Sequence, residues 1–157
     1  MKIEIQGGEQ VAAALAKLGA EAPTALGVGL TQWAEAVMAD SKANYVPVDT
    51  GALRASGTVS RPEMTATTVS LTLGYGGAAA PYALSVHENP RAGKTGGVSP
   101  RGKRYRTWAR VGEWKFLESP VKLHAVKLRD FLARALTQAI GKTARGARRF
   151  GGGFRFR

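Results

Sequence analysis

The first 44 residues carry a short alternating segment followed by apolar side chains at helical spacing. Residues 2–6 alternate between polar and apolar, which predicts a short strand. Residues 9–21 predict a short helix. A second helix is expected to begin near Pro23, which suits a first helical turn, and to run to about Asn44. Its apolar stripe consists of Leu26, Leu30, Trp33 and Val37. We expect Trp33 to lie in the core.

Period-two alternation predicts two strands further along the chain. Residues 53–60 and 68–75 each place apolar or small side chains on one face and mainly polar ones on the other. A turn is expected at residues 61–63, so the two strands would form an antiparallel hairpin with one face on a helix. Residues 81–88 fit either a strand or a short helix opened by Pro81, and their periodicity does not decide between them.

A last helix is predicted over residues 120–140. Ser119 followed by Pro120 is a strong helix start, because serine caps helix N-termini and proline suits the first helical position. Gly141 is well placed to end this helix. The residues expected to face inward are Val121, Leu128, Leu132, Ala135, Leu136 and Ala139.

The composition is that of a globular chain with one domain, or one domain plus an extension. The chain has 157 residues, 44% of them hydrophobic, and no cysteine. The missing thiols exclude disulfides, cysteine-ligated zinc or iron–sulfur sites and cysteine nucleophiles. No apolar run reaches the ~18 residues of a membrane span. The polar residues close behind Met1 are not those of a signal peptide.

The charge is distributed unevenly. The net charge of the chain is +12; residues 1–90 carry −3 and residues 91–157 carry +15. This asymmetry predicts a polyanionic or acidic partner for the second part. Residues 91–103 have no core-facing pattern. Residues 103–111 alternate like a strand, with Arg104, Arg106, Trp108 and Arg110 on one face.

Two kinds of partner fit these basic segments. The candidate contacts to DNA or to an acidic protein are Arg101, Lys103, Arg104, Arg106, Arg110, Lys142, Arg145, Arg148, Arg149, Arg155 and Arg157. Contacts to DNA would be independent of sequence, because no helix-turn-helix, zinc-finger or RNA-recognition signature is present. Their affinity would fall steeply with salt.

No set of residues predicts catalysis. Asp49-Thr50-Gly51 matches the aspartic-protease triplet, but that chemistry needs two carboxylates and the chain has one copy. The alternative is a turn in which Asp49 and Thr50 bond nearby backbone N–H groups. His87 and His124 are the only histidines, and neither has the spacing of a metal site. We expect no enzymatic activity and no cofactor.

Three sequence blocks follow one another in a recognisable order. The blocks span residues 46–56, 82–88 and 115–120. Their residues of interest are Pro47, Asp49, Thr50, Gly51, Leu53, Tyr82, Glu88, Phe116, Leu117 and Pro120. With these blocks the chain resembles the tailed-bacteriophage family of small neck and tail-completion proteins, which form head–tail connector or tail-terminator rings. The family pattern is a proline followed by TG-x-L-x-x-S, then YA-x-x-V-(H)E, then FL-x-x-P before a closing helix.

The resemblance implies an α+β fold, in which a small antiparallel β-sheet packs against two or three helices. Residues 1–141 would form one ring-forming domain, and residues 142–157 an extended basic arm. Many family members have a short loop after the glutamate, whereas this chain has a long basic loop at about residues 89–113. The loop and the arm carry most of the positive charge, so the family role does not explain them.

The implied function is a structural subunit of the virion neck, which joins the DNA-filled head to the tail. The protein would be made in the host cytoplasm and would form a homo-oligomeric ring, a hexamer or a dodecamer. Its partners would be adjacent connector, portal-side or tail-tube proteins and packaged DNA, without contact to a membrane. Two alternatives remain: a free, sequence-independent DNA-binding protein acting through residues 91–157, and a hydrolase acting through Asp49.

Overall fold

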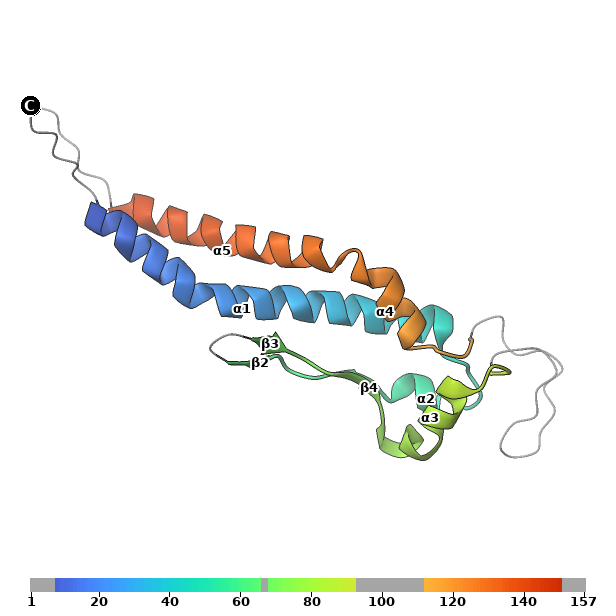
Figure 1. Cartoon of the computed structure of the whole chain (residues 1–157). Coiled ribbons are helices and arrows are strands. Elements are labelled where there is room, and N and C mark those ends of the chain that lie inside the picture. The colour runs from blue at the N-terminus through green and yellow to red at the C-terminus, as the bar shows by residue number, and fades with distance from the viewer. Residues whose placement is uncertain (1–7, 66–67, 93–111, 151–157) are drawn as a thin grey trace, which may run out of the picture.

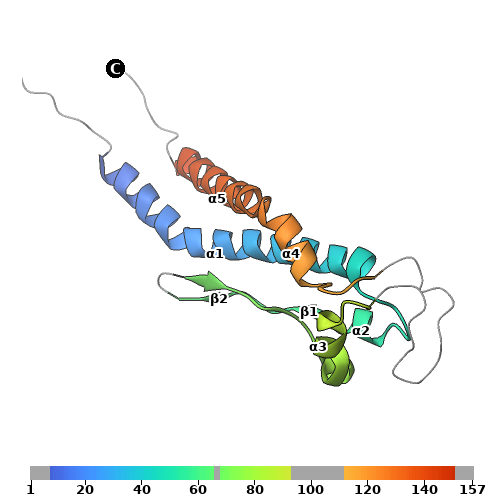
Figure 2. The ribbon, with the colours of Figure 1, turned by 45° about the vertical axis from the view of Figure 1, so that its right-hand side comes forward.

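A long helix forms the middle layer of the molecule. The computed structural model describes residues 8–65, 68–92 and 112–150. Helix α1 (Gly8–Asp40) has helix α5 (Leu128–Phe150) along one side and a β-hairpin along the other (Figure 1). The same three layers are visible after a rotation of 45° (Figure 2). The chain is therefore a mixture of helices and small antiparallel sheets, as predicted.

Helix α1 is a single helix where the sequence predicts two. It continues through Pro23 to Asp40, and a π-helical turn (Ser41–Tyr45) follows it. Proline removes one backbone hydrogen bond and usually bends a helix rather than extending it straight. The helix bends in its first half (Figure 2) and stays packed on α5 on both sides of the proline. Residues 2–6 lie outside the described residues.

Helix α5 also continues past its predicted end. The segment 118–150 forms α4 (Glu118–Ala125) and, after a break at Val126 and Lys127, α5. Gly141 does not adopt the positive φ of a helix terminator. Beyond it, Thr143 is buried and donates a hydrogen bond of 2.8 Å to Glu21 Oε2 of α1. Packing on α1 therefore carries the helix through the glycine, and residues 142–150 are not an extended arm.

Most of the predicted details of this helical segment hold. Ala135 is buried, and the other residues expected to face inward are partly buried: Val121, Leu128, Leu132, Leu136 and Ala139. The predicted start is off by two residues, because α4 begins at Glu118 and Ser119 lies inside its first turn without capping it.

The antiparallel hairpin is confirmed, in two short ladders. Strand β1 (Gly57–Val59) pairs with β4 (Leu73–Tyr75), and β2 (Glu63–Met64) pairs with β3 (Val69–Ser70). Between the ladders, the backbone N–H and the hydroxyl of Ser60 both bond Thr72, each over 2.8 Å. The predicted alternation also holds in residues 68–75. The odd-numbered side chains are partly buried, whereas Thr68, Ser70 and Thr72 are exposed.

The first half of the strand predicted at residues 53–60 is wrong. Residues 52–55 form the one-turn helix α2 (Ala52–Ala55), which follows Gly51 in the left-handed region at φ 83°. Leu53 is buried but Ala55 is exposed, so the two are not on one face. The alternating pattern is too short here to distinguish a strand from a helical turn.

The open choice at residues 81–88 resolves as a helix. A 3₁₀ turn (Gly77–Ala79) leads into α3 (Ala80–Glu88), and Pro81 occupies its first turn. The strand predicted at residues 103–111 and most of the basic loop lie outside the described residues.

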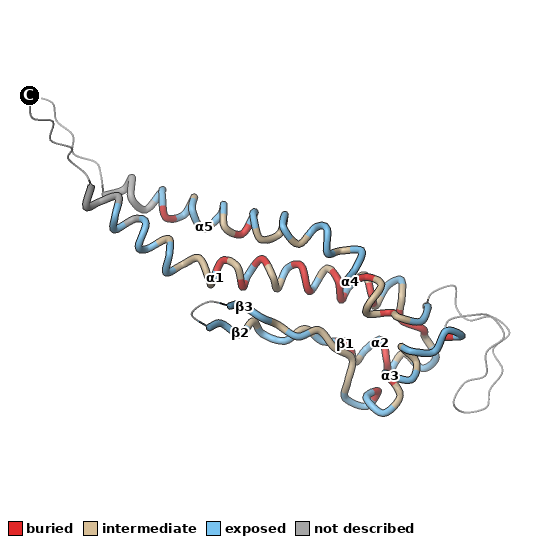
Figure 3. Tube along the Cα trace, viewed as in Figure 1, coloured by how far each residue is buried: buried red, intermediate tan, exposed pale blue. Residues whose placement is uncertain are grey.

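Two glycines allow the layers to approach α1 closely. A Cβ atom at Gly27 would meet Met64 of the hairpin, and one at Gly29 would lie 3.0 Å from the Phe131 carbonyl of α5. Between these layers lies a first core cluster of Trp33, Ala34 and Val37. The buried positions that the structure describes on α1 lie in its second half, from Ala25 onward (Figure 3). The prediction that Trp33 is a core residue is therefore confirmed.

Candidate functional site

The three sequence blocks meet in one core cluster, which we call the Phe116 cluster. Its buried members are Val46, Leu53, Ala79, Ala83 and Phe116, and the partly buried side chains around them are Tyr45, Tyr75, Tyr82, Val86 and Leu117. Each block contributes at least one side chain. The chain thus brings together blocks that lie up to 70 residues apart in the sequence.

Phe116 lies at the centre of this cluster. It is 1% exposed, and its ring makes edge-to-face contacts with Tyr75, at 5.1 Å between centroids, and with His87, at 4.9 Å. Aromatic pairs in this geometry contribute about 0.5–1.5 kcal/mol each beyond area burial. Phe116 therefore holds the end of α3, the end of β4 and the start of α4 together.

Ser41 ties the cluster to the end of α1. Its fully buried hydroxyl donates to the Phe116 carbonyl over 2.6 Å and lies 2.7 Å from the Tyr75 hydroxyl. A serine hydroxyl has one hydrogen, so Tyr75 must donate to Ser41. Burial raises the pKa of the Tyr75 phenol, which keeps this hydrogen available. The three groups form a satisfied polar network inside an apolar cluster.

An ion network covers the outer side of the second and third blocks. Lys115 contacts both Glu88 oxygens, at 2.7 and 2.9 Å, and Glu118 at 3.1 Å. Its amide also donates to the His87 carbonyl. Hydrogen bonds from Lys115 and then from His87 lower the pKa of Glu88. Hydrogen bonds from Lys122 and then Lys115 lower that of Glu118 to about 2. The carboxylates are thus held ionised by neighbouring cations.

The triplet Asp49-Thr50-Gly51 forms a surface turn. Gly51 supplies the left-handed conformation, and the Thr50 hydroxyl accepts a long contact of 3.4 Å from the Ala52 amide. Asp49 is exposed and has no hydrogen bond or ion pair with any other described residue. The predicted turn is confirmed for Thr50 and Gly51, whereas the backbone bond expected for Asp49 is not formed there.

His124 is a structural residue at the junction of α1 and α4. Its Nε2 lies 2.9 Å from Asp40 Oδ2, and its carbonyl accepts a hydrogen bond of 2.8 Å from the Trp33 indole. The pKa of Asp40 is lowered, chiefly by a hydrogen bond from Asn44. A hydrogen bond from His124 lowers it too, with a smaller effect. Within residues 8–65, 68–92 and 112–150, no three acidic or histidine side chains gather where they could hold a metal ion.

The comparisons with known proteins add nothing to this geometry. No family model, no curated protein and no solved structure matches the chain. Function must therefore be argued from the chain itself. Over the part of the chain that the structure describes, no helix has both the length and the apolar character that crossing a membrane requires.

The family-motif residues contribute mainly to packing. Pro47, Leu53, Phe116 and Pro120 are buried, and Tyr82 and Leu117 are partly buried. The structure describes only some of the basic residues that are candidate contacts to DNA or to an acidic protein. Lys142 and Arg145 are exposed on α5, and Arg148 and Arg149 belong to the same helix, with side chains outside the description. The remaining candidates lie outside the described residues: Arg101, Lys103, Arg104, Arg106, Arg110, Arg155 and Arg157.

Sequence reasoning missed Ser41, Tyr75 and Lys115. One signal was available for Ser41, because it lies four residues after Val37 and so continues the apolar stripe of α1 with a polar side chain. Lys115 adopts a φ of 58°, which is uncommon for a residue with a Cβ. No sequence pattern predicts this conformation. The pairing of Lys115 with Glu88 depends on the folded chain.

Proposed function

We propose that the chain is a structural subunit of a tailed-phage virion neck. In this proposal it forms a homo-oligomeric connector or tail-terminator ring, of six or twelve copies, that joins the DNA-filled head to the tail. Adjacent connector, portal-side or tail-tube proteins contact the ring, and the subunit has no enzymatic activity.

The observation that carries the proposal is the joint packing of the three family-like blocks. Their apolar residues form the Phe116 cluster, and their charged residues pair with one another, as Glu88 does with Lys115. A catalytic motif would instead direct polar groups into a cleft where substrate could reach them. Sequence blocks that build a rigid body fit a protein whose work is assembly.

Deletion of the gene from a phage that carries it tests this proposal. We expect lysates with DNA-filled heads and separate tails, and we expect the wild-type gene supplied in trans to restore joined particles. A matched control carries Leu84→Ala, an exposed residue of α3 (72% exposed), and this variant should also restore them. Complete, infectious particles formed without the protein would overturn the proposal.

A second candidate, sequence-independent DNA binding, is favoured by the charge of residues 91–157 and by the exposed Lys142 and Arg145 on α5. It predicts binding to unrelated duplexes, with a log–log salt slope of about −0.9 for each phosphate contacted. Replacing Lys142 and Arg145 by glutamine would make that slope shallower. Absence of binding at low salt would remove this candidate.

A further inference from the structure

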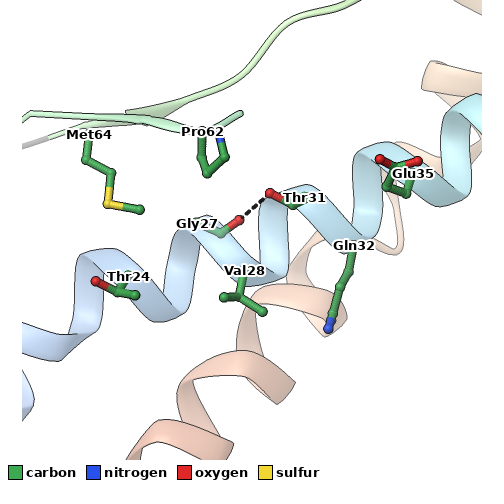
Figure 4. A pocket seen from close by; sticks show the side chains of 8 residues that line it. All are labelled: Thr24, Gly27, Val28, Thr31, Gln32, Glu35, Pro62 and Met64. Atoms are coloured by element: carbon green, nitrogen blue, oxygen red, sulfur yellow. Dashed lines mark hydrogen bonds between the residues drawn. The ribbon is translucent and has the colours of Figure 1, made fainter. Parts of the chain in front are cut away.

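Two hollows open on opposite sides of α1. The first, which we call the Val28 face, has a volume of about 470 Å³, and its lining includes Thr24, Val28, Gln32, Glu35, Pro62 and Met64 (Figure 4). The second, the Leu30 face, measures about 490 Å³, and its lining includes Pro23, Leu26, Leu30, Val69, Leu128 and Leu132. The Val28 face lies between α1 and the hairpin, and the Leu30 face lies where α1, the hairpin and α5 meet.

Helical geometry puts the two faces back to back. At 100° per residue, Val28 and Leu30 point about 160° apart around α1. The directions between them are filled, since Gly27 abuts Met64 of the hairpin and Gly29 abuts Ala135 of α5. The described part of the chain therefore presents a hollow on each of these two flanks.

Both faces leave apolar side chains in contact with solvent. Val28 is 47% and Met64 45% exposed on the first face. On the second, the apolar lining residues Leu26, Leu30, Leu128 and Leu132 are partly buried. Isolated exposed apolar residues are ordinary, but groups of them in a hollow mark interaction surfaces.

An exposed carboxylate and an exposed guanidinium lie on the two flanks. Glu35 lines the Val28 face and is exposed. Arg129 is exposed, and helical geometry places it about 60° around α5 from Leu132, which lines the Leu30 face. Neither forms an ion pair with any other described residue. They also lie at similar heights. Trp33 bonds His124 and Gly29 abuts Phe131, so Arg129 is within roughly 7 Å of Glu35 along the α1 axis.

We propose that these faces are the two halves of a head-to-tail contact between copies of this chain. The Val28 face of one subunit packs on the Leu30 face of the next, and Glu35 of the first faces Arg129 of the second. A contact of this kind joins each subunit to the next in one direction, and it closes into a ring when the rotation between neighbours divides a full turn. A two-fold contact through the Val28 face would instead bring Glu35 close to its own copy. The inference rests on the proposed ring and names the surfaces that build it.

Charge reversal tests the contact directly. Each of Glu35→Arg and Arg129→Glu places like charges opposite each other, so we expect the concentration for half-assembly to rise at least about tenfold. The double variant, or an equimolar mixture of the two single variants, restores opposite charges at every contact and should assemble like the wild type. Mass photometry of the full chain over a concentration series gives the readout.

The control is Arg134→Glu, which reverses an exposed charge about 140° further around the same helix and should leave assembly unchanged. Circular dichroism of each variant checks folding, which exposed positions should preserve. Single variants that assemble like the wild type, or a double variant that fails, overturn the contact while leaving the ring itself in place. A wild-type chain that stays monomeric contradicts the ring as well, so the two failures are distinguishable.

Discussion

The hydroxyl of Ser41 donates a hydrogen bond of 2.6 Å to the main-chain carbonyl of Phe116, a residue 75 positions further along the chain. This bond attaches the end of α1 to the segment that precedes α4. The Tyr75 hydroxyl, at 2.7 Å, completes the network from the end of β4. The end of the molecule where α1, β4 and α4 meet is thus held by polar contacts between three segments, inside an otherwise apolar cluster (Figure 1).

Ser41→Ala is expected to destabilise the fold by about 1–3 kcal/mol, because it leaves the Phe116 carbonyl and the Tyr75 hydroxyl buried without their partner. Urea unfolding followed by circular dichroism measures the loss. Ser85→Ala is the matched control, since Ser85 is exposed and, among the described residues, its hydroxyl bonds only the Tyr82 carbonyl of its own helix. An equal, small effect of both substitutions would contradict the role assigned to Ser41.

Stability should fall at alkaline pH because of Tyr75. Burial raises the pKa of this phenol in the folded state above its ordinary value of 10.0. Its contribution to the free energy of unfolding is therefore fully present below about pH 10 and is lost as the pH rises through the folded-state pKa. Unfolding titrations between pH 8 and 11 should show this loss in the wild type and a shallower one in Tyr75→Phe. Identical pH profiles would contradict it.

Gly29→Val is expected to cost about 1–3 kcal/mol, because a Cβ there already lies 3.0 Å from the Phe131 carbonyl and 3.1 Å from Ala135. The branched side chain would push α5 away from α1. In Gly19→Val, on the same helix, the new Cβ has no neighbour within 4 Å, so thermal unfolding should change little. If both variants melt alike, the close approach of the two helices at Gly29 is not what stabilises the pair.

Gly141→Ala tests the continuity of α5 by whether it raises or lowers the stability of the protein. Gly141 lies inside α5 with a helical backbone and open space around its Cβ position. Alanine should therefore stabilise the protein by about 0.5–1 kcal/mol. A helix that ended at this glycine in the left-handed conformation would be destabilised by the same change. The direction of the shift in melting temperature thus distinguishes a continuous α5 from a terminated one.

The sequence predicts those elements whose pattern agrees with their packing. The stripe on α1 predicts the buried Trp33 and Val37, whereas its first members, Leu26 and Leu30, are only partly buried. The alternation in residues 68–75 predicts the hairpin face. Pro23 and Gly141 mislead, because each is a local stop signal inside a helix whose tertiary packing continues. The hydrogen bond from Thr143 to Glu21 is an example of this packing, because it joins α5 beyond Gly141 to α1 before Pro23, across 122 positions of the sequence.

The candidate site was predicted in part. The three blocks could be recognised one by one, but their meeting at Phe116 depends on contacts between distant segments, which periodicity does not contain. Ser41 and Lys115 lie outside the block residues that match the family pattern, and their partners are identified only by the fold. The similar heights of Glu35 and Arg129, on opposite flanks of the molecule, likewise depend on the antiparallel packing of α1 and α5.

Electron microscopy of the purified full-length chain tests the central claim most directly. If the chain is a neck subunit, fields of particles should show closed rings of one fixed symmetry around an axial opening, with six or twelve copies. Discrete monomers at every concentration, both for the purified protein and within phage particles, would contradict the account.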